Sequence, residues 1–116
     1  MKLILDDDEV RIAKFRKKIP DCICFTNPNE FIRFIRDNMI KIEEMSLDHD
    51  LNFFESTPYK REVTGFDVCR AIADMTDLPR DIQIIIHSNN PDGSKRMKWT
   101  LEDAGFGFVY LSPFRA

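Results

Sequence analysis

Residues 2–8 have the sequence KLILDDD, in which a short apolar run is followed by three consecutive aspartates. The apolar run predicts a buried β-strand. Residues 10–19 place their apolar side chains near helical spacing, so a helix is predicted directly after that strand. A strand followed by polar residues and then by a helix is the repeating unit of α/β proteins.

The rest of the chain repeats this unit. Four further segments are predicted to be strands: 22–25, 45–48, 82–86 and 106–111. Three further segments are predicted to be helices: 28–42, 64–75 and 91–104. Alternation of this kind predicts a parallel sheet with right-handed crossovers and helices on both faces. We therefore expect an α/β fold: one three-layer, doubly wound domain over residues 1–116, with a five-stranded parallel sheet.

Polar side chains follow three of the predicted strands. They are Asp6, Asp7 and Asp8 after the first strand, Asp48, His49 and Asp50 after the third, and His87, Ser88, Asn89 and Asn90 after the fourth. If the strand order is 2-1-3-4-5, the third strand lies between the first and the fourth. All three groups then meet in one crevice at the carboxyl ends of the strands, where ligands of such folds bind.

The aspartates in this crevice predict a cation site. Carboxylates packed together repel each other unless a positive charge intervenes, and a divalent ion is the economical solution. A site made of oxygen ligands suits Mg²⁺ or Mn²⁺. The alternative is that residues 6–8 only cap the following helix and favour its dipole. The acids at the neighbouring strand end favour the cation site, because a cap needs no partner carboxylates.

His49 and His87 both fall at the edge of the predicted crevice. Histidine exchanges protons near neutral pH, so the pair could divide the roles of general base and general acid. If either histidine instead bound the metal, the mixed nitrogen and oxygen ligands would favour manganese or zinc.

The helix predicted to begin after Asn90 offers a phosphate site. Free backbone N–H groups and the positive end of the helix dipole can receive an anion there. Lys95 and Arg96 would add positive charge, while Ser88, Asn89 and Asn90 would supply hydroxyl and amide groups. The alternative is an ordinary capped helix start with solvated basic side chains.

Two aromatic segments leave alternatives open. The segment from Asn52 to Arg61 contains Phe53, Phe54 and Tyr59, and it could close over a ligand and stack on a base or pack on the core. Phe106, Phe108 and Phe114 lie near the end of the chain, where exposed aromatic side chains would indicate a homodimer.

Composition excludes two classes of partner. The net charge is −3 and there is no basic run of five or more residues, so we expect no binding to long nucleic acids. The longest apolar stretches are far shorter than the roughly 20 residues that span a membrane.

The first residues lack the features of a signal peptide, which predicts a cytoplasmic protein.

The acidic motifs resemble those of receiver domains, the flavodoxin-like phosphoacceptor modules of two-component signalling. LDDD at 5–8 resembles the receiver acidic pocket, Asp48 stands at the phosphoacceptor position, and Ser88 falls where receivers have Ser or Thr. The resemblance implies side-chain metal ligands at Asp7 and Asp48, Asp6 directly or through water, and the carbonyl of Asp50.

Two departures from the receiver pattern are visible near the end of the chain. YLSPF at 110–114 resembles the end of the fifth receiver strand, but Ser112 replaces the receiver lysine that neutralises the phosphorylated aspartate. The sequence ends at Ala116, so we expect a receiver-like domain without the last helix.

A more specific resemblance is to cyclic-phosphate processing receiver domains. It is carried by LDHDL at 47–51, TGFDV at 64–68 and HSNNPDG at 87–93, followed by Met97. This resemblance implies hydrolysis of a cyclic or terminal phosphate on a small nucleotide, with His49, His87 and Asp48 as the catalytic residues. The alternatives are a binding protein that sequesters a cyclic nucleotide without cleaving it, and a degenerate receiver that accepts phosphate on Asp48.

Overall fold

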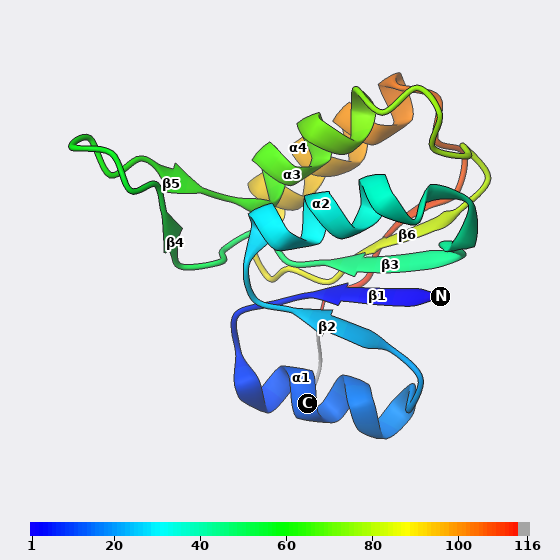
Figure 1. Cartoon of the computed structure of the whole chain (residues 1–116), viewed down its shortest axis with the longest axis horizontal. Helices are drawn as coiled ribbons and strands as arrows, with labels where there is room; N and C mark the ends of the chain where they lie inside the picture. Colours follow the sequence, from blue (N-terminus) through cyan, green and yellow to red (C-terminus); the bar gives the residue numbers. More distant parts are fainter. Residues whose placement is uncertain (114–116) are drawn as a thin grey trace.

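A five-stranded parallel sheet forms the centre of the computed structural model, which describes residues 1–113 (Figure 1). Its strands are β1 (Lys2–Leu5), β2 (Ile23–Phe25), β3 (Glu44–Leu47), β6 (Gln83–Ile86) and β7 (Val109–Leu111). The order across the sheet is β2-β1-β3-β6-β7, and every neighbouring pair is parallel. Counted along this sheet alone, that is the predicted order 2-1-3-4-5, which is confirmed.

Helices cover both faces of the sheet. Helix α1 (Glu9–Lys18) lies on one face, and α2 (Pro28–Asp37), α3 (Gly65–Ala73) and α4 (Pro91–Asp103) lie on the other (Figure 1). The three-layer architecture is therefore as expected for a doubly wound domain. Phe106, one of the aromatic residues considered for a dimer interface, is 2% exposed and belongs to the core, whereas Phe108 is exposed. Phe114 lies outside the described residues, and the homodimer stays a prediction.

The helix starts follow the capping rules read from the sequence. Asn27 caps α2 by accepting hydrogen bonds from the backbone N–H groups of Asn29 and Glu30, and Pro28 occupies the first helical position. At α3 the carboxylate of Asp67 accepts from the backbone N–H of Thr64 at 2.9 Å, as in a capping box. Asp67 therefore serves in place of the usual Glu or Gln.

The predicted helix over 28–42 is too long. Helix α2 ends at Asp37, and a 3₁₀ turn, η1 (Met39–Lys41), follows it. The side chain of Asn38 donates to the carbonyl of Phe34 at 2.9 Å. Asparagine competes in this way for backbone groups and favours helix ends, which apolar periodicity alone does not reveal.

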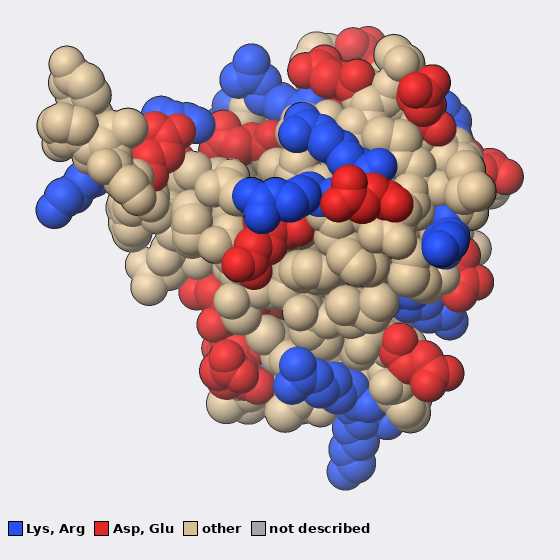
Figure 2. All heavy atoms as spheres, viewed as in Figure 1, with Lys and Arg blue, Asp and Glu red and all other residues tan. Residues whose placement is uncertain are grey.

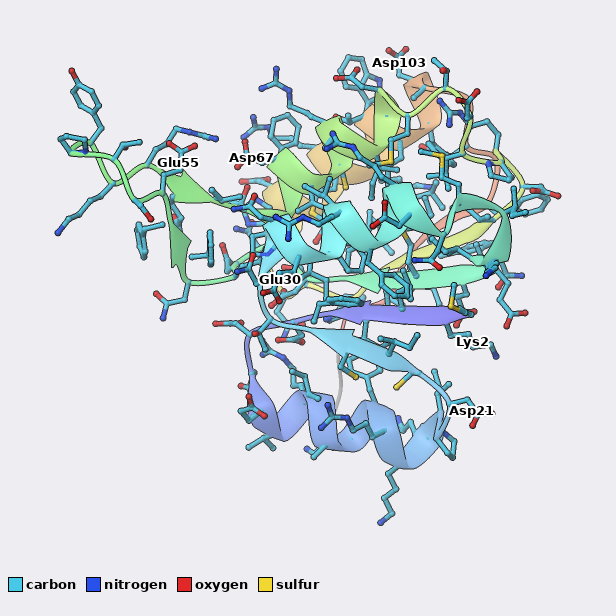
Figure 3. The ribbon with its side chains drawn as sticks, viewed as in Figure 1. Lys2, Asp21, Glu30, Glu55, Asp67 and Asp103 are labelled. Atoms are coloured by element: carbon cyan, nitrogen blue, oxygen red, sulfur yellow. The ribbon has the colours of Figure 1, made fainter. Side chains whose placement is uncertain are left out.

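The segment between β3 and α3, where no strand was predicted, contains a small antiparallel hairpin. Strands β4 (Phe53–Phe54) and β5 (Glu62–Val63) pair with each other and project away from the sheet (Figure 1). Arg61 ties the hairpin to α3, since it bonds both Glu55 and Asp67, which are labelled in Figure 3. Two-residue strands are too short to show a period in sequence. Phe53 packs on the core, but Tyr59 is 92% exposed.

Charged side chains of both signs are mixed over the face shown in Figure 2, with no single basic patch there. Within residues 1–113, no helix combines the length and apolar character needed to cross a bilayer.

Candidate functional site

The register of the sheet places three polar residues side by side. Leu5 pairs with Leu47, and Leu47 pairs with Ile86. The residues that follow these three are Asp6, Asp48 and His87, and they are 0%, 5% and 3% exposed. The sheet therefore brings together the ends of β1, β3 and β6, as the alternating pattern predicted.

A polar cavity of about 250 Å³ opens at this edge of the sheet. Its lining residues come from α1, from the end of β3 and from the turn that leads from β6 into α4: Arg11, Asp48, Asp50, His87, Ser88, Asn89 and Asn90. Six of these seven were predicted to lie in the crevice. Arg11 was not.

Arg11 is the cation at the centre of the cluster. Its Nε donates to Oδ2 of Asp6 and its Nη2 to Oδ1 of Asp6, both at 2.9 Å, in a bidentate pair. Nη2 also donates to Oδ2 of Asp48 at 3.2 Å. One sequence signal could have revealed this role: Arg11 lies three residues after the N-cap Asp8, so it shares the helix face that meets the acids.

The two buried carboxylates have pKa values shifted in opposite directions. Burial would raise the pKa of Asp6, but hydrogen bonds from His87, Arg11 and the Asp8 backbone hold it well below its usual range. Burial, followed by the charge of Asp6, raises the pKa of Asp48 to about 6. Arg11 and His87 oppose this rise without cancelling it. Asp48 is therefore a carboxyl group that can exchange a proton near neutral pH.

His87 is held at both ring nitrogens. Nε2 lies 2.9 Å from Oδ2 of Asp6, and because a carboxylate only accepts, Nε2 carries the proton. Nδ1 lies 2.7 Å from Oγ of Ser46, and the ring packs against Phe15. This arrangement fixes the orientation of the imidazole ring.

His49 lies beside the cavity rather than among its lining residues. Its Nδ1 is 2.8 Å from Oδ1 of Asp50 and 3.4 Å from the side-chain amide of Asn90. Gly93, in the first turn of α4, packs against the ring so closely that a Cβ there would lie 2.6 Å from Nε2. His49 is thus positioned by a carboxylate on one side and by a glycine backbone on the other.

The start of α4 has fewer free donors than expected. The N–H of Asn90 donates to Oγ of Ser88, and the N–H of Gly93 donates to Oδ1 of Asn90. Pro91 has no N–H to offer. Of the two predicted basic residues, Lys95 lines a neighbouring, mostly apolar cavity of about 210 Å³ that shares Ser88 and Asn89. The guanidinium of Arg96 instead lies 4.3 Å above the ring of Phe66.

Asp6, Asp48 and His87 together offer a group of metal-ligating atoms that all lie within 4.8 Å of one another. Asp7 is half-buried, and its Oδ1 lies 3.7 Å from Nη2 of Arg11. The carboxylate of Asp50 pairs with His49. Because Arg11 already bonds both buried carboxylates, a divalent ion that used Asp6, Asp48 and His87 as ligands would have to compete with this guanidinium.

The fold and the acidic edge of the sheet define a receiver-like protein. The sequence model of the family described as the cyclic-phosphate processing receiver domain matches residues 1–103. The chain belongs to this family.

Comparison with solved structures gives the same fold. A response regulator from Burkholderia pseudomallei, whose structure has a phosphorylated aspartic acid, a calcium ion and citrate, superposes with a TM-score of 0.63 at 16% sequence identity. The match covers 98% of this chain but 60% of that one, so the chain spans less than two thirds of that protein. No curated protein sequence matches the chain.

Proposed function

We propose that the cavity binds the phosphate group of a small cyclic nucleotide and that the protein hydrolyses one of its phosphoester bonds. The observation that carries this proposal is the meeting of three groups at one cavity: the guanidinium of Arg11, the proton-exchanging carboxyl of Asp48, and Asp50, which holds His49 beside the cavity. A volume of about 250 Å³ is below the roughly 300–1,000 Å³ of sites for drug-sized ligands. It suits a phosphate and the ring that carries it.

The residues divide into a base and an acid. Asp50 accepts the Nδ1 proton of His49, which leaves the lone pair on Nε2 to take a proton from an attacking water. The water oxygen forms a bond to phosphorus as the bond to the leaving oxygen breaks. Asp48, whose pKa is near 6, donates its proton to that leaving oxygen. Arg11 stabilises the negative charge that develops on the phosphate.

Membership of the cyclic-phosphate processing family supports the substrate class. The position of Ser112, where receivers have lysine, supports hydrolysis over storage of phosphate on Asp48.

Sequestration without hydrolysis is the second candidate, and one observation favours it. Both ring nitrogens of His87 are already hydrogen-bonded inside the protein, to Asp6 and Ser46. His87 therefore positions Asp6 and cannot exchange a proton with a ligand as it stands. A single available histidine gives weaker acid–base catalysis than two.

Incubation with linear, 2′,3′-cyclic and oligomeric cyclic nucleotides, read by chromatography, tests the proposal. The reactions are run with EDTA, with magnesium and with manganese. We expect turnover of one cyclic substrate and losses of about 100-fold in His49→Ala and Asp48→Asn. Asp103→Asn, at the far end of α4 (Figure 3), is the control. Recovery of intact nucleotide from a denatured complex would favour sequestration, and full activity in both site variants would refute the proposed mechanism.

A further inference from the structure

The acidic cluster was predicted to hold a divalent ion, but in the structure its two buried carboxylates are hydrogen-bonded to Arg11. We propose that the guanidinium of Arg11 takes the place of that ion and is also the group that binds the phosphate of the ligand. This inference rests on the proposed function, because it assumes that the cavity receives a phosphate.

Asp6 has no acceptor position left. A carboxylate has two oxygens with about four lone-pair positions in all. Oδ1 of Asp6 accepts from the backbone N–H of Asp8 and from Nη2 of Arg11, both at 2.9 Å. Oδ2 accepts from Nε of Arg11 and from Nε2 of His87, again both at 2.9 Å. A metal ion could reach Asp6 only after one of these charge-assisted or buried hydrogen bonds had broken.

The other two candidate ligands are also engaged. His87 contacts Asp6 through Nε2 and Ser46 through Nδ1, so neither nitrogen is open to a metal. Asp48 accepts from the backbone N–H of His49 through Oδ1 and from Arg11 through Oδ2. The ligating atoms of Asp6, Asp48 and His87 are therefore already hydrogen-bonded within the protein.

The guanidinium of Arg11 has N–H donors beyond those that Asp6 and Asp48 use. A guanidinium carries five N–H groups, and the three on Nε and Nη2 are used by Asp6 and Asp48. Nη1 carries the other two. Among residues 1–113, its nearest recorded acceptor is Oδ2 of Asp8 at 3.8 Å, beyond hydrogen-bonding distance. Arg11 lines the polar cavity, so this donor pair is available to a ligand there.

A phosphate is the ligand that this geometry fits. Arginine pairs with phosphate oxygens through parallel N–H bonds, and the carboxylates behind it hold the plane of the guanidinium in place. At the start of α4 the N–H groups of Asn90 and Gly93 are already bonded, so these two groups cannot bind the phosphate in its place. Arg11 therefore supplies the main fixed positive charge at the cavity.

The first experiment uses the unmodified protein and inorganic phosphate. Phosphate binding is measured by NMR titration of the backbone amides, with EDTA or with magnesium added, and Mn²⁺ binding is measured by water-proton relaxation. We expect the same phosphate affinity with and without metal, with shifts at residues 87–90, and no Mn²⁺ binding at the cluster. Phosphate binding that requires magnesium, or saturable Mn²⁺ binding that broadens Asp6 and Asp48, would overturn the proposal.

The second experiment uses Arg11→Gln, with Arg16→Gln as the matched control, since Arg16 is exposed on the same helix. We expect Arg11→Gln to weaken phosphate binding about 10-fold or more and to gain Mn²⁺ binding, while Arg16→Gln changes neither. If Arg11→Gln does not fold, Arg11→Lys keeps the charge but loses the bidentate fork, and it should weaken phosphate binding several-fold while staying folded. Equal phosphate affinity in the folded variant and the unmodified protein would overturn the proposal.

Failure of this inference is distinguishable from failure of the proposed function. Hydrolysis of a cyclic nucleotide that needs magnesium would refute the role of Arg11 and leave the phosphoesterase intact. Metal-independent phosphate binding without turnover of any nucleotide would support the role of Arg11 and refute the proposed hydrolysis.

Discussion

Replacing Asp48 by Asn should make the protein more stable at neutral pH. In the folded protein, burial and the charge of Asp6 raise the pKa of Asp48 from 3.8 to about 6. The folded state therefore holds a proton that the unfolded state releases at lower pH, and stability falls as pH rises through this window. Each pKa unit is worth about 1.4 kcal/mol, so the charged carboxylate lowers the unfolding free energy by about 3 kcal/mol above pH 6.

Asparagine has nearly the same shape and carries no charge, so Asp48→Asn avoids this loss. We expect the variant and the unmodified protein to have similar stability near pH 4, with a gap that opens toward pH 6 and then stays constant at about 2–3 kcal/mol. Urea unfolding followed by far-ultraviolet circular dichroism, repeated across this pH range, measures the gap. A variant that is less stable at pH 7.5, or a gap that is the same at acid and neutral pH, would refute the reasoning.

Asp67→Asn is a control whose effect on stability should be opposite to that of Asp48→Asn. Burial would raise the pKa of Asp67, but hydrogen bonds from Thr64 and Arg61 lower it. Its charge therefore stabilises the fold at neutral pH, and the benefit is lost as the pH falls through the folded pKa. We expect Asp67→Asn to reduce stability by about 1 kcal/mol at neutral pH, with a difference that shrinks toward acid.

Three further predictions follow from other contacts of the site. Gly93→Ala should displace His49, because its Cβ would lie 2.6 Å from Nε2. It should lower stability by about 1–3 kcal/mol in urea unfolding and reduce any hydrolysis; Gly107→Ala, which has open space around it, should be neutral. Ser46→Ala removes the partner of Nδ1 of His87, so the ¹⁵N resonance of that nitrogen should move and stability should fall by about 1–3 kcal/mol; an unchanged resonance would contradict the contact. Acetyl phosphate should leave no adduct on Asp48, which is buried and bonded to Arg11, and a phosphorylated Asp48 in mass spectrometry would instead favour the degenerate receiver.

The sheet, and the proximity of the polar residues at the ends of its strands, could be predicted because both depend on the order of strands and helices along the chain. Alternating strands and helices force parallel pairing, and parallel strands end at the same edge. Asp6, Asp48 and His87 are each the first residue after a buried strand. Their proximity therefore follows without knowledge of any side-chain conformation.

The charge balance of the site could not be predicted in the same way. The sequence shows carboxylates that need a cation, but it does not show whether that cation is a metal or a side chain. Arg11 reaches Asp6 and Asp48 because of the rotation of α1 above the sheet and the direction of one long side chain. The phosphate site expected at the start of α4 could not be judged from the sequence for a related reason. The N–H groups of Asn90 and Gly93 donate to the side chains of Ser88 and Asn90, and the sequence does not show these hydrogen bonds.

The alignment of Leu5, Leu47 and Ile86 across the sheet also determines where this chain can change in length. One residue inserted into β1, β3 or β6 would move the following polar residue along the sheet and turn its side chain to the opposite face, because side chains alternate along a strand. The hairpin tip around Tyr59, which is exposed and distant from that alignment, has no such constraint. Relatives that keep this cavity should therefore vary in length at the hairpin and keep these three strands without insertions or deletions.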